Sequence, residues 1–330
     1  MRAPEFWSRR SPLACGLAPL GVAYGLGARL RQGLARPHRV TAPVICIGNL
    51  TVGGAGKTPT ALAVATMLRG LGHRPHFLTR GYGGRLAGPV RVDPAVHTAA
   101  DVGDEPLLLA AEAPCWVARD RPAGAEAAVA DGADVVVMDD GLQNTRLAKD
   151  LCLAVVDAEA GFGNGFVLPA GPLREFVADG LERVQAVVAV GGDGGRVRAL
   201  LPAAGRGKPV LAARFVLRAP ALPGRRVFAF AGIARPAKFF DSLRALGCDI
   251  AGTAGFPDHH PFRADELAAL RRQAEAAGAV LVTTAKDHVR LPATERETVV
   301  RVDGTLVFEE PQAVVALLAR AMEERAKVAG

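Results

Sequence analysis

The sequence predicts an α/β fold with two α/β/α domains, the second one smaller, and a cleft between them. Two observations lead to this prediction. From residue 43 onward, short β-branched runs alternate with stretches rich in alanine, leucine and arginine, as expected for strands that alternate with helices. The strand-like runs are apolar at consecutive residues, which is typical of parallel strands that are buried on both faces.

The strand and helix candidates follow one another along the whole chain. In the first domain, strands are expected at residues 43–48, 74–79, 115–118, 134–138, 151–157 and 186–190. In the second domain, strands are expected at residues 210–217, 226–231, 249–254, 279–283 and 298–302. Helices are expected at residues 58–71, 123–131, 237–246, 264–277 and 311–325. The Gly- and Pro-rich stretch 202–209 is the expected seam between the domains.

Composition narrows the class of partner. Of the 330 residues, 50% are hydrophobic and only 5% aromatic, so the core must consist mainly of Ala, Val and Leu. The formal net charge of +7 comes chiefly from arginine, which fits nucleotides, phosphorylated substrates or an anionic membrane. Genome composition explains an arginine excess equally well. The five cysteines are scattered without a CxxC pair, which indicates core residues in a reducing compartment.

The strongest motif is VICIGNLTVGGAGKTPTALAVA, in which a β-branched run leads into a glycine-rich loop and then into a helix. Its glycines let backbone N–H groups surround phosphate oxygens without clashes from Cβ atoms. Lys57 supplies a positive charge for the β- and γ-phosphates of ATP, and Thr58 supplies a hydroxyl for Mg²⁺. A glycine-rich structural turn is the alternative. The expected nucleotide-binding residues are Thr51, Val52, Gly53, Gly54, Ala55, Gly56, Lys57 and Thr58.

The motif departs from GxxxxGK[ST] at one position, because Thr51 stands where the first glycine belongs. Downstream, Asp139 and Asp140 end the apolar run DVVVMDD, which is expected to be a buried strand. A carboxylate at the end of a strand beside a phosphate loop is the position that holds Mg²⁺. A turn or a helix cap is the alternative for two adjacent aspartates, but the phosphate loop upstream favours the metal site.

The apolar stretch 13–30 follows the basic pair Arg9 and Arg10 and is interrupted by glycines and Pro19. It is shorter than the roughly 20 residues with which a helix crosses a bilayer. A cleaved signal peptide has a similar order of charges, but the ATP site that follows indicates the cytosol. We therefore expect a helix in the membrane interface, with a helix packed on the protein's own surface as the alternative.

Further motifs narrow the possible families of phosphate-loop proteins. They are TRGYGG at 79–84, GDEP at 103–106, FGNG at 162–165 and PAGPLRE at 169–175. Together with GNLTVGGAGKTP and DDGLQ, they resemble in order and spacing the tetraacyldisaccharide 4′-kinase family, the lipid A 4′-kinases of Gram-negative bacteria. The resemblance extends nearly from end to end, through AGFPDH at 254–259 and TTAKD at 283–287.

This resemblance implies an enzyme that uses ATP and Mg²⁺ to phosphorylate the 4′-hydroxyl of an acylated glucosamine disaccharide 1-phosphate in lipid A biosynthesis. It implies a membrane-associated helical segment at 1–40, a P-loop kinase domain at 41–205 and a second α/β domain at 206–330 that closes the active-site cleft. The expected location is the cytoplasmic face of the inner membrane, peripheral or monotopic. No nucleic acid and no obligate protein partner are expected.

The resemblance also implies roles for individual residues. Asp104, working with His259, is the expected acceptor of the hydroxyl proton, and Lys57 and Arg174 are expected to stabilise charge on the transferred group. The expected ligands of Mg²⁺ are Thr58, Asp139, Asp140, Gln143 and Glu175. Substrate contacts are expected from Glu105, Arg121 and Asn144. The family often has histidine at position 144, so the role of Asn144 stays open.

Two other classes of protein compete with this interpretation. A partner-coupled P-loop GTPase would need a guanine-reading motif, and residues 284–287 hold the right residue types in a shifted order. A nucleic-acid-binding protein would fit the basic charge, but the sequence has no basic helix run and no basic patch interleaved with aromatic residues.

Overall fold

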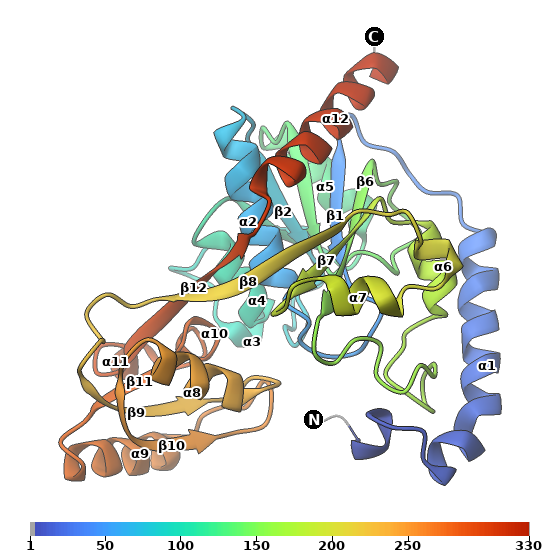
Figure 1. The fold of residues 1–330 in the computed structure, drawn as a ribbon. Helices are drawn as coiled ribbons and strands as arrows, with labels where there is room; N and C mark the ends of the chain where they lie inside the picture. Colours follow the sequence, from blue (N-terminus) through green and yellow to red (C-terminus); the bar gives the residue numbers. More distant parts are fainter. Residues whose placement is uncertain (1–3, 330) are drawn as a thin grey trace.

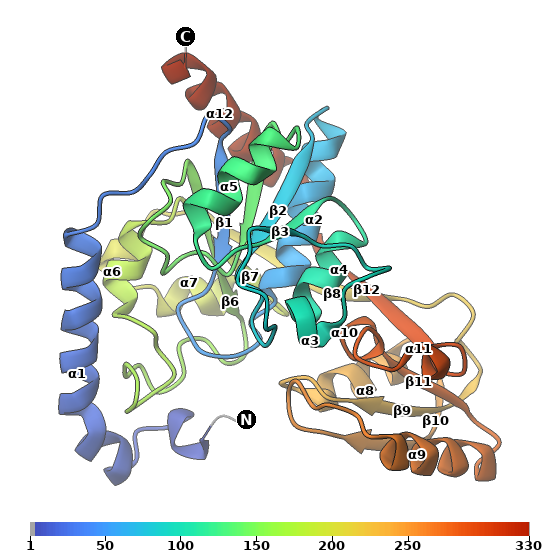
Figure 2. The ribbon, with the colours of Figure 1, turned by 180° about the vertical axis from the view of Figure 1, so that it is seen from behind.

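Two α/β units joined by a pair of long strands make up the structure, a computed structural model that describes residues 4–329 (Figure 1, Figure 2). The first unit has the strands β1 (Val44–Gly48), β2 (Pro75–Thr79), β3 (Val90–Arg91), β4 (Cys115–Val117), β5 (Val135–Asp139), β6 (Leu151–Asp157) and β7 (Ala186–Val190). Its helices are α2 (Lys57–Gly70), α3 (Ala99–Val102), α4 (Asp104–Ala110), α5 (Arg121–Ala130), α6 (Val177–Glu182) and α7 (Gly195–Leu200).

The second unit is smaller and has the strands β9 (Arg226–Ala231), β10 (Asp249–Gly255) and β11 (Val280–Thr284). Its helices are α8 (Pro236–Ala245), α9 (Ala264–Ala276), α10 (Ala285–His288) and α11 (Ala293–Arg296). The joining strands are β8 (Val210–Arg218) and β12 (Val300–Phe308). Outside the two units lie the terminal helices α1 (Pro12–Gly33) and α12 (Pro311–Ala329) and the short 3-10 helices η1 (Glu5–Trp7) and η2 (Ala203–Gly205).

All strands belong to one 12-stranded sheet in the order β10-β9-β11-β12-β8-β7-β6-β1-β5-β2-β4-β3. Neighbouring strands are parallel except at the pairs β3–β4 and β8–β12. Strand β1 lies between β5 and β6, so the loop after β1 emerges beside the carboxyl end of β5. This arrangement brings the phosphate loop next to Asp139 and Asp140.

Helices cover both faces of the sheet, as the apolar runs predict. Alternate side chains of β1 enter opposite cores: Ile45 and Ile47 pack with α2, whereas Val44 and Cys46 pack on the side of α5. The same division holds in the second unit, where α8 covers one face of β9 and α9 covers the other. The predicted α/β fold with helices on both faces is therefore confirmed. The short elements β3, α3, α6, α7, α10 and α11 had no expected counterpart.

The connection between the units runs through β8 and β12, which pair antiparallel from residues 213–218 to residues 303–308 (Figure 1). The sequence predicted a strand at 298–302 that is shorter than β12. Helix α12 follows β12 back to the first unit and packs Val314 and Leu318 into the core beside α2. The domain boundaries at residues 40 and 205 stay predictions. Residues 1–3 of the first predicted segment and residue 330 of the last lie outside the described residues.

Helix α1 packs against the first unit through its smallest side chains. Ala14, Gly21, Gly25 and Ala28 are its buried residues, and a Cβ atom added to Gly25 would lie 2.6 Å from the ring of Phe176. The large apolar side chains point outward instead and are exposed to solvent, for example Leu13, Leu20, Val22, Leu26, Leu30 and Leu34. With 22 residues and a mean hydropathy of 1.3 over an 18-residue window, α1 is long and apolar enough to cross a membrane by these two criteria.

The close approach of α1 can be tested at Gly21. A Cβ atom there would lie 2.6 Å from the backbone oxygen of Val167, which cannot rotate away. We expect Gly21→Ala to lower the free energy of unfolding by about 1–3 kcal/mol, as overpacking does elsewhere. Thermal unfolding in detergent would measure this change.

Gly16→Ala is the matched control in the same helix. Among the described residues, no atom lies within 4 Å of the position of an added Cβ at Gly16. Alanine should therefore stabilise this variant by up to about 1 kcal/mol through its better helix propensity. Equal effects of the two substitutions would show that α1 does not pack as described.

Candidate active site

The phosphate loop spans residues 49–56 between β1 and α2. Gly53 and Gly56 have φ values of 115° and 96°, a region that favours glycine. Thr51 instead forms an extended bridge with Leu173, which explains why a glycine is not required at this position. The first N–H groups of α2 have no partner within the helix and form a site for phosphate. All eight expected nucleotide-binding residues lie in this loop and in the first turn of α2.

A buried hydroxyl–carboxylate pair lies at the base of the loop. Thr58 Oγ1 donates a hydrogen bond of 2.8 Å to Asp139 Oδ2, and Asp139 is 1% exposed. Within residues 4–329, Asp139 Oδ1 has no hydrogen-bond partner. A buried carboxylate oxygen without a partner is costly unless a ligand completes it. The pair thus fits a divalent cation.

The two aspartates differ in electrostatics. Burial raises the pKa of Asp139 to about 7, and the charge of Glu105 adds to this effect. Burial also raises the pKa of Asp140, but the cations Lys57 and Arg174 outweigh it and hold that pKa below its usual value. Arg174 donates to Asp140 Oδ1 at 2.8 Å, and Lys57 Nζ lies 3.9 Å from the same oxygen.

In the part of the chain that the structure describes, no cluster of three or more His, Cys, Asp and Glu side chains forms a complete metal site. In kinases, Mg²⁺ usually takes some of its ligands from the oxygens of the nucleotide. Thr58, Asp139 and Asp140 could supply the protein's share of these ligands.

Gln143 and Glu175 belong to a hydrogen-bonded chain that leads away from this site. Gln143 Nε2 donates to the Asn49 carbonyl and to Glu175 Oε1, each at 2.9 Å. Glu175 Oε2 accepts from Gln32 of α1 at 2.9 Å and from Arg183 at 2.6 Å. Both carboxylate oxygens of Glu175 are thus engaged. Its role as a metal ligand stays a prediction, and Oε1, which accepts a single hydrogen bond, is the oxygen with a lone pair left for a metal.

Asp104 of the first unit is in contact with His259 of the second unit. Asp104 is the first residue of α4, and His259 lies in the loop after β10 with a φ of 59°. His259 Nδ1 is 3.1 Å from Asp104 Oδ2, so the expected pair is assembled in this structure. The ring of Tyr82 contacts the His259 ring edge-on, with a centroid distance of 5.7 Å.

Two cations that the sequence analysis did not assign lie beside this pair. Arg290 Nε donates to Asp104 Oδ2 at 2.8 Å, and Lys286 Nζ lies 3.3 Å from His259 Nε2. Burial raises the pKa of Asp104, but the hydrogen bond from His259 and the charges of Lys286 and Arg290 hold it well below its usual value. Lys286 belongs to the motif TTAKD, whereas no motif pointed to Arg290.

The expected substrate residues have different surroundings. Glu105 faces Lys286 Nζ at 3.4 Å. Arg121 begins α5 and is 4% exposed; its guanidinium donates to the Ala118 carbonyl, and burial lowers its pKa to about 10. Asn144 Oδ1 accepts from the backbone amides of Arg146 and Leu147, so this oxygen is engaged in a turn. A substrate contact of these residues stays a prediction.

A phosphate loop at the end of β1, a carboxylate pair at the end of β5 and an aspartate–histidine pair that joins the two units define a phosphotransferase of the P-loop class. The model of the family described as tetraacyldisaccharide-1-P 4′-kinase (LpxK) matches residues 13–323. The chain belongs to this family, as the order of its motifs predicted.

Solved and curated relatives agree with this assignment. A tetraacyldisaccharide 4′-kinase of Methylobacterium sp. is 55% identical over 99% of both chains, and one of Rhodospirillum centenum is 54% identical over 97% of this chain and 96% of its own. The fold is similar to that of LpxK from Aquifex aeolicus in complex with ATP, with a TM-score of 0.76 and 26% identity. That match covers 94% of this chain and 99% of the other.

The raised pKa of Asp139 predicts a pH-dependent gain in stability for Asp139→Asn. The unfolded carboxyl ionises near pH 4, roughly, whereas the folded one keeps its proton up to about 7. Native stability of the nucleotide-free protein therefore falls as the pH rises across this window. The asparagine does not titrate, so its advantage should be complete above about pH 7 and absent below about pH 4. Urea unfolding without Mg²⁺ across this range would measure it.

Asp140→Asn is the matched control, and the opposite sign is expected. Asp140 has a lowered pKa in the folded state, so its contribution to stability is present above the unfolded pKa and is lost as the pH falls. Removing this charge should destabilise the protein at neutral pH. A loss of stability in both variants would contradict the difference between the two carboxyl groups.

Proposed function

We propose that the protein transfers the γ-phosphoryl group of ATP to the 4′-hydroxyl of a tetraacyldisaccharide 1-phosphate, a precursor of lipid A. Membership of the kinase family over nearly the whole chain supports the reaction. The observation that supports the assignment of the active site is the contact of Asp104 with His259 in a protein that also has a phosphate loop. A hydrolase has no need of a side chain that takes a proton from an alcohol, whereas a kinase does.

The phosphate loop would hold and orient ATP. The amides of residues 53–58 and Lys57 contact the β- and γ-phosphates, and the rest of the site provides charge. Thr58, Asp139 and Asp140 would hold Mg²⁺, which neutralises charge on the transferred group when it is bound. Arg174 is held beside Asp140 at 2.8 Å and supplies a further cation at the same place. These groups act by positioning and by electrostatics.

Asp104 would accept the proton of the attacking hydroxyl. Its Oδ2 is engaged with His259 and Arg290, whereas its Oδ1 accepts only the Glu105 amide, at 3.1 Å, among the residues described. The low pKa of Asp104 means that it is ionised at neutral pH and ready to accept. Because Asp104 and His259 belong to different units, this arrangement would form only where the two units are in contact.

The structure disfavours the GTPase alternative. Asp287, the aspartate of the near-match to a guanine-reading motif, is fully buried. Its carboxylate accepts from Thr284 Oγ1 at 2.6 Å and from Arg290 Nη1 at 2.8 Å. An aspartate that reads guanine must offer both oxygens to the base, and this one cannot do so without losing its partners.

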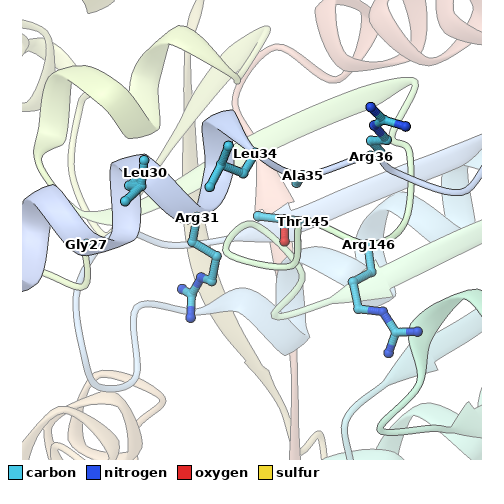
Figure 3. A pocket seen from close by; sticks show the side chains of 8 residues that line it. All are labelled: Gly27, Leu30, Arg31, Leu34, Ala35, Arg36, Thr145 and Arg146. Carbon is cyan, nitrogen blue, oxygen red and sulfur yellow. The ribbon is translucent and has the colours of Figure 1, made fainter.

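Helix α1 supports a location at the membrane surface, which we take to be the cytoplasmic face of the inner membrane. Its outward face carries large exposed apolar side chains, and such a patch marks an interaction surface. At the end of α1, a pocket of about 580 Å³ combines Leu30 and Leu34 with Arg31, Arg36 and Arg146 (Figure 3). Apolar and cationic groups side by side suit an acylated, anionic lipid.

The first test follows labelled phosphate from ATP into a tetraacyldisaccharide 1-phosphate in detergent micelles with Mg²⁺. The wild-type protein should phosphorylate the lipid, and Lys57→Ala and Asp104→Ala should each lower kcat by about 100-fold or more. ATP binding should weaken in Lys57→Ala and persist in Asp104→Ala. Nucleotide binding without any labelled lipid would refute the proposed acceptor and leave the phosphate loop intact.

The membrane proposal predicts that Leu20→Gln and Leu30→Gln together weaken binding to anionic vesicles. These side chains are 60% and 65% exposed on α1 and would lose burial in the bilayer, roughly 1.5–3 kcal/mol each. Co-sedimentation should show a loss of about tenfold or more, with ATP binding unchanged. Val96→Gln, at a side chain 71% exposed elsewhere on the first unit, should have no effect. Equal sedimentation of all variants would show that α1 does not face the membrane.

A further inference from the structure

The two carboxylate oxygens of Asp104 differ in the number of hydrogen-bonding and charged partners. Oδ2 accepts two donors of Arg290, Nε at 2.8 Å and Nη2, and lies 3.1 Å from His259 Nδ1. Lys286 Nζ is a further 3.9 Å neighbour of this oxygen. Within residues 4–329, Oδ1 has a single partner, the backbone amide of Glu105. Residues of the second unit thus bind Oδ2, whereas Oδ1 keeps a lone pair that can accept a proton.

Arg290 is held in place by its own unit. Its Nη1 donates to the Gly232 carbonyl and to Asp287 Oδ1, each at 2.8 Å. Asp287 is in turn fixed by the Thr284 hydroxyl at the start of α10. The Arg290 side chain is only 6% exposed. Its planar fork is therefore oriented by the core of the second unit, and a lysine could not reproduce all of these bonds.

Lys286 selects the tautomer of His259. Its ammonium group lies 3.3 Å from His259 Nε2 and has only donors, so Nε2 must act as the acceptor. Nδ1 then carries the ring proton and donates it to Asp104 Oδ2. Burial lowers the pKa of Lys286, but the carboxylates of Glu105, Asp104 and Asp258 raise it above its usual value, so the ammonium form persists.

We propose that Arg290 and Lys286 are positioning residues for phosphoryl transfer, Arg290 by holding Asp104 through Oδ2 and Lys286 by fixing the His259 tautomer that carries its proton on Nδ1. The inference rests on the proposed function. In the step they support, the hydroxyl proton passes to Asp104 Oδ1 while the acceptor oxygen bonds to the γ-phosphorus. The bond from that phosphorus to the β–γ bridging oxygen breaks, and ADP leaves with its electron pair.

Arg290→Lys tests how Arg290 holds Asp104, because the substitution keeps the positive charge and removes the planar guanidinium that donates two hydrogen bonds to Oδ2. We expect kcat to fall by about 100-fold while KM for ATP and for the lipid stay within about twofold. Arg244→Lys, at an exposed arginine of α8 in the same unit, is the control and should match the wild type. An unchanged kcat, or a rise in KM alone, would overturn the assignment.

A second variant guards against a folding defect. Asp287→Asn weakens the anchor of Arg290 without contacting Asp104, and it should lower kcat in the same direction by a smaller factor. Thermal unfolding and ATP binding would report whether each variant is folded. If both variants are folded and bind ATP, full activity in both would refute the role of Arg290.

The pH dependence of kcat/KM distinguishes the proposed role of Arg290 from a purely structural one, which would not shift it. The groups that face Asp104 are His259, Arg290 and Lys286 from the second unit and Glu105 from its own helix. Arg290→Gln removes a positive charge, so protonation of Asp104 should occur at higher pH. The acidic limb of kcat/KM should move upward by about one pH unit or more. An acidic limb identical to that of the wild type would contradict the inference.

The role of Lys286 can be read without any activity. In protein with ¹⁵N-labelled histidine, at a pH where the ring is neutral, His259 should show a single tautomer with its proton on Nδ1. Lys286→Met should convert this signal into a mixture of the two tautomers, and the spectrum of His259→Gln assigns it. The same single tautomer in Lys286→Met would refute this role. If the wild type fails to phosphorylate the lipid, the proposed function fails, whereas the tautomer result stands.

Discussion

The antiparallel pairing of β8 with β12 determines where the second unit can lie. These strands are the point at which the sheet of the first unit continues into the sheet of the second, so the loops after β10 and β11 are carried to the start of α4. Helix α12 then returns to pack on α2, which ties the end of the chain to the helix that begins at Lys57. The contact between Asp104 and His259 depends on this geometry, because Asp104 belongs to the first unit and His259 to the second.

Buried charges concentrate where the chemistry takes place, and they are balanced in different ways. Asp104 is compensated by His259 and Arg290, whereas Asp139 has one oxygen bonded to Thr58 and, among the described residues, no partner on the other. A buried pair costs desolvation, which its Coulomb attraction offsets only with good geometry. The carboxylate of Asp139 at the phosphate loop is therefore best understood as part of a ligand site, whereas Asp104 is held through Oδ2 by the protein's own cations and keeps Oδ1 for a proton.

Helix α1 reverses the usual distribution of side chains on a surface helix. Its glycines and alanines face the protein and its leucines face outward, so close backbone packing holds it to the first unit. Gln32 near its end also bonds to Glu175, which reaches Gln143 and the loop at Asn49. A helix suited to a lipid surface is thus in direct hydrogen-bonded contact with the residues that support the phosphate loop.

The sequence by itself determined the α/β fold, the phosphate loop, the aspartate pair and the family, because these rest on local patterns: strand–loop–helix order, a glycine-rich loop, and motifs along the chain. It also placed the apolar segment that becomes α1, but periodicity cannot say which face packs inward. Only the tertiary structure decided that Glu175 is engaged by Gln32 and Arg183, that one sheet joins both units, and that Arg290 grips Asp104. These contacts join residues distant in sequence, and no local pattern encodes them.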